Sequence, residues 1–378
     1  MKAARQDVRL DDVCGIASVL VDPRKAEYQE MIHVGGANIE SATGGLGNLM
    51  TAREEELKSG KFLFDDTMVL YSKIRPYLMK VARPDFRGLC SADIYPLSPD
   101  RSQLDRDYLF YLLLTTEFTD FAIAGSARAG MPKVNRDHLF GFRLSLPPLP
   151  EQRRIVGILD EAFGGIATAK ANAEKNLQNA RALFESHLQS VFTHRGPGWA
   201  EKTVDQISTN LDSKRIPITK SDRKSGKYPY YGASGIVDHV AEYIFEGDAL
   251  LVSEDGANLL MRSTPIAFSV SGKYWVNNHA HILRFANMPT QRFVEFYLGS
   301  IRLDEYIRGA AQPKLTQTAL NAIPIPIPEP VEAQGVIVRR IELLSEETQR
   351  LASIYQQKLA ALDELKKSLL HQAFTGQL

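Results

Sequence analysis

An internal duplication is the feature of this sequence that most constrains its fold. The segment MPKVN at residues 131–135 recurs as QPKLT at 312–316, and LSLP at 144–147 recurs as IPIP at 325–328, both at an offset of 181 residues. Further on, SHLQSVFT at 186–193 recurs as SLLHQAFT at 368–375, at an offset of 182. A repeated sequence predicts repeated structural units, so each half of the chain is expected to form the same set of elements.

Upstream of these segments the two halves match more weakly. Gly35 and Ile39 resemble Gly232 and Ile236 at an offset of 197, and the first residues of each half resemble each other at an offset of 194. The offset between matching residues thus falls from 194–197 near the start of each half to 181 further along, so more residues separate the matching segments in the first half than in the second. The first half is therefore expected to carry additional loop residues.

Each half begins with a mixed region of short apolar runs and turn residues. Thr67–Tyr71 and Ala249–Val252 have the composition of strands, whereas Tyr108–Thr115 and Arg292–Leu298 have helical periodicity. A chain of 378 residues is also long enough for two domains. We therefore expect two α+β domains, at residues 1–150 and 195–331.

A proline-rich segment and then a long segment without proline follow each mixed region. No proline occurs between Pro150 and Pro197, or after Pro330, and proline just before the first turn is typical of a helix start. The predicted helices occupy residues 151–194 and 332–378. Apolar residues recur in each at alternating steps of three and four, from Ile155 to Val191 and from Ile337 through Leu365 to Ala373, which is the pattern of a coiled coil.

Two repeats related by a pseudo-twofold axis place their long helices antiparallel to each other. The fold class expected is therefore α+β, with two pseudo-twofold-related domains separated by two long antiparallel coiled-coil helices. The predicted register brings small residues against large ones. It pairs Ile166 with Leu359, Ala169 with Tyr355, Ala173 with Leu351, and Phe184 with Ile341.

Composition excludes several classes of protein. No apolar run approaches the ~20 residues that a membrane span needs, and the first residues lack the pattern of a signal or transit peptide, so we expect a cytoplasmic protein. Two cysteines, Cys14 and Cys90, cannot form a disulfide framework and are expected in the core. The formal net charge is +0, so a nucleic-acid surface has to be local.

The motifs of catalysis are absent from the sequence. It has no phosphate-binding Walker loop, no amine-gripping tetrapeptide of an amino-methyltransferase, and no Pro-Asp with the acidic-x-Lys partner of a metal-dependent nuclease. The Gly-rich segment 43–48 is expected to be a turn. His279 and His281 are expected to form hydrogen bonds rather than to bind metal, because no cluster of carboxylates or thiols accompanies them in sequence.

The strongest binding signal is a basic segment in the second half. Its cations are Lys214, Arg215, Lys220, Arg223, Lys224 and Lys227, and Tyr228, Tyr230 and Tyr231 follow them. Cations neutralise phosphates, and a loop with tyrosines and small residues can approach base edges, so the segment fits a loop that reads a DNA groove. A solvated loop above packed tyrosines fits the same composition.

The residues LPPLPEQRRIVGILD, KYPYYGASGI, LLVSEDGANL and LLHQAFTGQL, together with the duplication, resemble the specificity subunits of type I restriction-modification systems. The resemblance extends over essentially the whole chain. It implies two target-recognition domains, at 1–150 and 195–331, each reading one half of a bipartite double-stranded DNA target. It also implies two spacer helices that bind two modification subunits and, in the full complex, restriction subunits.

The same resemblance implies that this chain has no catalytic, cofactor-binding or metal-binding residues of its own. The modification subunits would methylate adenine with S-adenosylmethionine, and ATP and Mg²⁺ would also belong to partner subunits. The spacer helices would set the distance between the half-sites. Forty-three helical residues span roughly 64 Å, which corresponds to at most about 19 base pairs.

The segments at Met31–Ser41 and Lys214–Ser234 are the candidate readers of the two half-sites. Further candidate phosphate contacts are Lys73, Arg75, Arg128, Lys133, Arg308 and Lys314. Both recognition regions are nearly neutral, so we expect tight DNA binding only together with modification subunits. Two alternatives remain open at this point: a transferase or nuclease with degenerate motifs, and a duplicated coiled-coil adaptor without sequence-specific DNA binding.

Overall fold

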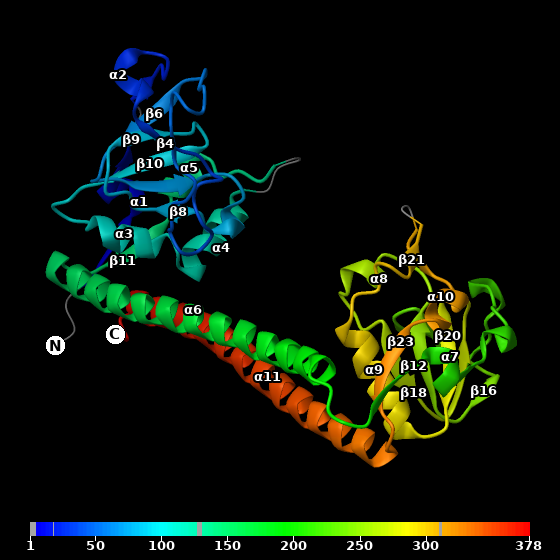
Figure 1. Ribbon diagram of the computed structural model, residues 1–378. Coiled ribbons are helices and arrows are strands. Elements are labelled where there is room, and N and C mark those ends of the chain that lie inside the picture. The colour runs from blue at the N-terminus through cyan, green and yellow to red at the C-terminus, as the bar shows by residue number, and fades with distance from the viewer. Residues whose placement is uncertain (1–4, 18, 127–130, 310–311) are drawn as a thin grey trace. The chain divides into compact units, whose positions relative to one another are not determined.

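The computed structural model describes residues 5–17, 19–126, 131–309 and 312–378 (Figure 1). The chain divides into two compact units. The first consists of Met1–Ala173 with Gln357–Leu378, and the second is Glu174–Gln356. Each unit combines one of the predicted domains with the parts of both long helices that pack on it.

The described residues of the first unit form three sheets. A two-stranded sheet pairs β1 with β11, a four-stranded sheet has the order β2-β10-β7-β8, and a five-stranded sheet has the order β3-β6-β9-β4-β5. The strands are β1 (Gln6–Arg9), β2 (Cys14–Ile16), β3 (Leu20–Val21), β4 (Ile32–Val34), β5 (Met50–Thr51), β6 (Lys61–Phe64), β7 (Val69–Ser72), β8 (Val81–Ala82), β9 (Gly88–Cys90), β10 (Ile94–Pro99) and β11 (Arg143–Leu146). The short helices are α1 (Leu10–Val13), α2 (Ala26–Gln29), η1 (Pro76–Leu78), α3 (Arg106–Leu112), α4 (Thr116–Ala124) and α5 (Arg136–Phe140).

The second unit repeats this plan. β12 pairs with β23, a four-stranded sheet has the order β13-β20-β17-β18, a second has the order β15-β14-β19-β16, and β21 pairs with β22. The strands are β12 (Trp199–Thr203), β13 (Ser208–Asn210), β14 (Ser225–Gly232), β15 (Gly235–Val240), β16 (Phe245–Glu246), β17 (Ala249–Ser253), β18 (Ala267–Val270), β19 (Lys273–Val276), β20 (Ala280–Phe285), β21 (Ile307–Arg308), β22 (Lys314–Leu315) and β23 (Pro324–Pro328). The short helices are α7 (Val204–Ile207), η2 (Asp212–Lys214), η3 (Lys220–Asp222), α8 (Asn258–Met261), α9 (Met288–Ser300) and α10 (Gln317–Asn321).

A central strand buried on both faces explains why each unit has layers. In β17, Leu250 and Val252 belong to the core shared with α9 and the long helices, whereas Ala249 and Leu251 face the second sheet. In β7, Val69 and Tyr71 face the helical side and Leu70 faces the second sheet. A strand with two apolar faces reads as a continuous apolar run. The predicted strand at 249–252 is confirmed, and the one at 67–71 is confirmed from Val69 onward, because Thr67 lies in the turn before it.

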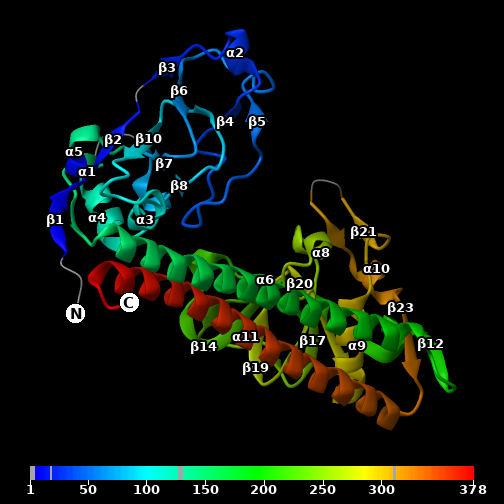
Figure 2. The same cartoon turned by 90° about the vertical axis from the view of Figure 1, so that its left-hand side faces the viewer.

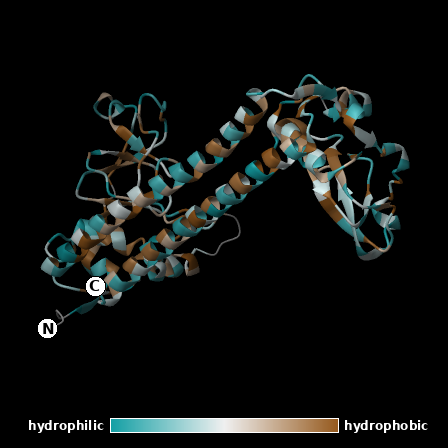
Figure 3. Cartoon of the chain, turned by 60° about the horizontal axis from the view of Figure 1, so that its bottom comes forward, coloured by the Kyte–Doolittle hydropathy of each residue, from teal (hydrophilic) through white to brown (hydrophobic). Residues whose placement is uncertain are grey.

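The two long helices are α6 (Leu149–Thr193) and α11 (Val331–Thr375), which confirms the expected proline-free helices. Apolar residues recur along both of them between charged ones (Figure 3). In the first unit, Ile155 and Leu159 of α6 share a core with Leu370 and Ala373 of α11, and there the two helices run antiparallel. In the second unit, Leu188 and Phe192 share a core with Val338 and Ile341.

A buried glutamine stands in the first turns of each long helix. Gln152 donates hydrogen bonds to the carbonyls of Pro147 and Gln103, and its Oε1 accepts one from the N–H of Asp105. Gln334 donates to the carbonyl of Pro328 and accepts from the Thr290 hydroxyl. Each glutamine thus joins the long helix to the preceding strand and to the helix that packs on the central sheet.

None of the helices that the structure describes is both long and apolar enough to cross a membrane. Cys14 and Cys90 are both buried free thiols in the first unit, as predicted. Burial raises the pKa of both thiols to about 12.

Candidate nucleic-acid interface

The duplicated segments 131–135 and 312–316 lie beside the carboxyl ends of the two central strands. In the first unit the N–H of Arg75 donates to the carbonyl of Pro132, and the N–H of Val134 donates to that of Lys73. In the second unit the N–H of Gly256 donates to Pro313, and that of Leu315 donates to Glu254. The repeat in sequence is therefore a repeat in backbone hydrogen bonding.

The last residues of each duplicated segment fix it to the core. Val134 and Leu315 are fully buried. Asn135 and Thr316 then cap the helices α5 and α10 through hydrogen bonds to backbone N–H groups. The hydrogen bond to the proline carbonyl restrains the backbone before Lys133 and Lys314. The buried apolar residue and the helix cap restrain it after them.

Side chains from the neighbouring strand hold the same carbonyl in both units. Tyr95 of β10 donates from its hydroxyl to the carbonyl of Val134 at 3.3 Å, and His281 of β20 bonds through Nε2 to the carbonyl of Leu315 at 2.8 Å. Tyr95 is opposite Tyr71, and His281 is opposite Val252, so the two residues occupy equivalent positions. A tyrosine hydroxyl in one unit and a histidine ring in the other thus bind the equivalent backbone carbonyl.

We call the surface formed at this strand end the rim of each unit. Rim 1 consists of residues 35–36, 73–79, 91–93 and 131–133, and rim 2 of residues 232–233, 254–262, 277–279 and 312–314. The bonds that join the outer segments are equivalent as well: Ser91 and Asn277 donate their N–H groups to Val34 and Tyr231. Figures 1 and 2 both place α8 and β21 at the same end of the second unit.

Rim 2 is built over a buried ionic cluster. The guanidinium of Arg215 lies 2.6 Å from Glu254 and 3.6 Å from Asp212, and Lys314 lies 3.1 Å from Glu254. His281 Nδ1 lies 2.5 Å from Asp212. The other ring nitrogen, Nε2, bonds to the carbonyl of Leu315, so both ring nitrogens of His281 face acceptors.

Cations hold both carboxylates of this cluster in the charged form. Burial alone would raise the pKa of Asp212, but the hydrogen bond and charge of His281, the Ile282 amide and Arg215 outweigh it and hold that pKa below its ordinary value. Burial also opposes ionisation of Glu254, whose pKa is lowered by Arg215, His281 and Lys314. Asp212, Glu254 and His281 are close enough together to ligate a metal, but Arg215 and Lys314 already balance their charge.

Rim 1 has the opposite arrangement of charge. Lys73 stands where rim 2 has Glu254, and its Nζ donates to the carbonyl of Ala92. Asp93 lies 3.5 Å from Lys133 and 3.9 Å from Lys73. Burial and the neighbouring Lys133 charge lower the pKa of Lys73. Rim 1 is therefore rich in cations, with Asp93 as the carboxylate that bridges two of them.

The predicted basic segment separates into exposed and structural residues. Lys214, Lys220, Lys224 and Lys227 are exposed and able to meet phosphates. Arg215 belongs to the buried cluster, and Arg223 pairs with Asp238 at 3.2 Å and stacks over Tyr230. Tyr230 is buried, so for this residue the alternative interpretation, a tyrosine packed beneath a solvated loop, is the correct one. Tyr231 is half-buried.

The other predicted contacts are distributed as follows. Arg75 and Arg308 are exposed, and Lys133 and Lys314 reach the rims but pair with carboxylates. Arg128 lies outside the described residues. Within Met31–Ser41, Val34 is equivalent to Tyr231, because β4 pairs with β9 in parallel as β14 does with β19. The weak sequence match at an offset of 197 therefore corresponds to equivalent positions in the two sheets.

Sequence reasoning missed the carboxylates of the rims, Asp93, Asp212 and Glu254. A signal was present, because Glu254 directly follows the apolar run of β17. The offset of 181 also aligns Lys73 with Glu254 and Arg75 with Gly256. Applying that offset to every position would have revealed the rim.

The predicted helix seams agree with burial except at one residue. Every predicted seam residue of α6 is buried or half-buried, whereas Leu183 is 63% exposed. In α11, Leu365 was predicted in the seam but is 46% exposed. Lys366 takes its place, with its Nζ donating to the carbonyl of Ala42 and lying over the Phe163 ring.

The predicted pairing of α6 with α11 stays a prediction. Its interface residues, Ile166, Ala169, Ala173, Phe184, Ile341, Leu351, Tyr355 and Leu359, are all buried or half-buried. Lys170 reaches Asp363 at 2.7 Å, whereas the predicted register places residue 355 opposite it. Helical side chains lean toward the N-terminus by about one residue position, which accounts for only part of this difference.

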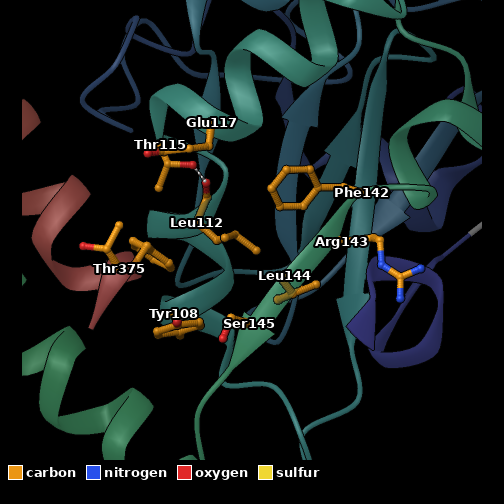
Figure 4. Close-up of a pocket in the computed structure, with 10 residues that line it drawn as sticks. Tyr108, Leu112, Thr115, Glu117, Phe142, Arg143, Leu144, Ser145 and Thr375 are labelled. Atoms are coloured by element: carbon orange, nitrogen blue, oxygen red, sulfur yellow. Dashed lines mark hydrogen bonds between the residues drawn. The ribbon is translucent and has the colours of Figure 1, made fainter. Parts of the chain in front are cut away.

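A small pocket of about 150 Å³ lies where the end of α11 meets the first unit (Figure 4). Tyr108, Leu112, Phe142 and Leu144 supply apolar walls, and Thr115 donates its hydroxyl to the carbonyl of Leu112. Glu117 and Arg143 lie at its edges (Figure 4). This lining fits helix packing better than a reactive site.

Comparison with known proteins identifies the family. The family model of the Type I restriction modification DNA specificity domain matches residues 5–177 and 197–357, and the chain belongs to this family. It is 37% identical over 206 residues to the type I restriction enzyme EcoDI specificity subunit of Escherichia coli, covering 53% of this chain and 44% of that protein. It is 35% identical over 209 residues to the putative type I restriction enzyme specificity subunit S.HindORF215P of Haemophilus influenzae, covering 50% and 52%.

These matches span about half the length of the two curated relatives. Solved structures agree over more of the chain. A chain from a study of complex assembly and conformational transition of the type I R-M system aligns with a TM-score of 0.82 and 19% identity, covering 99% of this chain and 98% of that one. The HsdS subunit from Thermoanaerobacter tengcongensis aligns with a TM-score of 0.68 and 20% identity, covering 99% and 97%. At these identities the likeness establishes the fold.

Proposed function

We propose that the chain is the DNA specificity subunit of a type I restriction-modification complex. Each recognition domain reads one half of a bipartite target, and the long helices set the spacing and dock two modification subunits and, in the full complex, restriction subunits. The observation that carries this proposal is the rim, which a chain of this family builds twice on the same backbone with different exposed residues. Two domains that read different half-sites need the same backbone with different exposed side chains.

Local charge supports double-stranded DNA as the ligand. Lys214, Lys220, Lys224 and Lys227 are exposed in the second unit, and Arg75 is exposed in the first, although the net charge is +0. Phosphate neutralisation and counterion release need such local cations. Because few of them are free, we infer that modification subunits supply further basic surface and that the isolated chain binds weakly.

The chemistry of the proposed complex belongs to its other subunits. We infer that S-adenosylmethionine, ATP and Mg²⁺ bind to partner subunits in the cytoplasm and that this chain directs them to a site without catalysing a step. In that setting it would mark host DNA by adenine methylation and expose foreign DNA to restriction.

The test is single-molecule methylome sequencing of a host that expresses this chain with its modification subunit. A host with the modification subunit alone is the control. We expect a bipartite methyladenine motif that appears only with this chain. Exchange of one recognition domain, together with the first turns of the long helix that follows it, for the equivalent residues of a relative should then change one half of the motif and leave the other unchanged.

A methylation motif that is the same with and without this chain would contradict the proposal. A stable complex with an active modification subunit that directs no motif would favour the duplicated coiled-coil adaptor instead. Calorimetry of S-adenosylmethionine with the purified chain tests whether the cofactor binds only to partner subunits. Binding to this chain alone would indicate that the chain is an enzyme.

A further inference from the structure

Arg75 occupies a left-handed backbone position on rim 1. Its φ is 50°, and the equivalent residue of rim 2 is Gly256 at φ 105°. Both N–H groups donate to the proline carbonyl of the duplicated segment, Pro132 or Pro313. The backbone at this point therefore requires a positive φ in both units, and the second unit meets the requirement with glycine.

A side chain at this position has an energetic cost. The left-handed conformation is unfavourable by roughly 1 kcal/mol for a residue with a Cβ, and glycine avoids this penalty. Non-glycine residues held there tend to cluster at functional sites, where the surroundings over-determine the backbone. An arginine at residue 75 therefore calls for a reason beyond backbone geometry.

The folded chain offers no such reason. Arg75 is exposed, and its guanidinium has no hydrogen bond or ion pair with any residue that the structure describes. Arg262 is a useful contrast, because it also has a positive φ, of 53°. Its guanidinium donates to the carbonyls of Leu298 and Ile301, so its own hydrogen bonds account for its conformation.

The surroundings of Arg75 suit a nucleic-acid groove. Tyr77 is 52% exposed and Met131 is 55% exposed on the same rim, where Lys73 and Lys133 supply charge. The N–H of Arg75 is held by Pro132, and its carbonyl accepts from the N–H of Leu78. The arginine thus leaves the surface from a backbone that is fixed on both sides.

Building on the DNA-reading role proposed above, we propose that Arg75 reads a guanine in the half-site of the first recognition domain. The planar guanidinium donates two parallel hydrogen bonds to O6 and N7 of guanine in the major groove. A phosphate contact needs only charge, which an unstrained surface position provides equally well. Gly256 has no side chain, so the second half-site is read by other residues.

The test compares methylation motifs directed by the wild-type chain, R75G and R75K, each in complex with modification subunits. Wild type is expected to show a guanine at one position of the first half-site. R75G is expected to lose the preference for guanine at that position by about 5- to 150-fold, which is the discrimination of a bidentate contact. R75K, which replaces the planar fork by a single ammonium, is expected to lose part of that preference. The second half-site should not change.

E56G is the matched control. Glu56 is also exposed, has a φ of 50°, and lies outside the four segments of rim 1. Both R75G and E56G should be at least as stable to denaturant as wild type, because both relieve a left-handed residue. Only R75G should change the motif.

Two results would overturn the inference. Retention of the guanine by R75G excludes Arg75 as a reader, and weaker binding of every sequence by that variant would then assign the side chain to a phosphate. A change of the same position by E56G would trace the effect to backbone strain. A wild-type chain that directs no motif is distinguishable from both, because it overturns the proposed function itself.

Discussion

The two rims have the same backbone and reversed charge. Rim 1 carries Lys73 where rim 2 carries Glu254, and each pairs its duplicated lysine with a carboxylate from a different segment, Asp93 or Glu254. Tyr95 bonds to the carbonyl of Val134 in the first unit, and His281 bonds to the equivalent carbonyl of Leu315 in the second. Duplication has thus retained the backbone hydrogen bonds while the side chains at the strand end have diverged.

This difference distinguishes two kinds of residue. The proline, the buried apolar residue and the helix cap of each duplicated segment maintain the fold, because their bonds are the same in both units. Residues that differ at the strand end are free to serve recognition. Rim 2, however, depends on a buried ionic cluster, and rim 1 does not.

The largest expected effect is on that cluster. His281→Phe keeps an aromatic ring but leaves Asp212 without its closest cation, and we expect the second unit to lose about 2–4 kcal/mol of stability. Both tryptophans, Trp199 and Trp275, lie in the second unit, so tryptophan fluorescence during denaturation measures this loss.

The first unit provides the control for His281→Phe. Cys14 and Cys90 both lie there, so their protection from a thiol reagent reports that unit by itself. Thiol protection should match wild type. An unchanged fluorescence transition would contradict a stabilising role for the cluster.

Acid should also affect the two units differently. The pKa values of Asp212 and Glu254 are depressed in the folded state, so their contribution is complete above the unfolded values of about 4 and is lost as the pH falls through the folded values. We expect the tryptophan signal to report opening of the second unit below about pH 4, before pepsin, a protease active in acid, cleaves within the first unit. Simultaneous transitions would show that the cluster does not limit acid stability.

Tyr95→Phe should have a smaller effect than His281→Phe. The substitution removes the hydrogen bond to the Val134 carbonyl and keeps the aromatic ring, so we expect a loss of about 1 kcal/mol in the first unit. Thiol reactivity in denaturant is the measurement. A loss as large as that of His281→Phe would mean that the two residues have equivalent energetic roles.

The smallest expected effect concerns exposed charge. Lys224→Ala should lower the slope of log affinity against log salt concentration by about one for the assembled complex, with little change in sequence preference. Lys58→Ala, an exposed substitution outside both rims, should leave the slope unchanged. A changed motif with Lys224→Ala would assign base reading to the basic segment.

Duplication and periodicity made most of the fold predictable from the sequence. The segment 131–135 and its copy pointed to repeated units, and the proline-free segments gave both long helices. Leu365 was misplaced because periodicity does not register that the Lys366 stem can replace leucine against Phe163. The basic segment was only partly interpretable, because composition does not distinguish exposed Lys224 from Arg215, whose partners are distant in sequence.

The buried glutamines have a consequence for how such chains recombine. Gln152 and Gln334 are covalently part of the long helices, yet their hydrogen-bond partners belong to the recognition domains. These partners are the backbone of Pro147, Gln103 and Asp105 for Gln152, and the Pro328 carbonyl and the Thr290 hydroxyl for Gln334. A crossover at the proline segment would separate each glutamine from its partners, whereas a crossover a few turns inside the helix would carry them together. Exchange of specificity between relatives should therefore favour breakpoints within the helices, so that each domain is inherited with the first turns of the helix on which it sits.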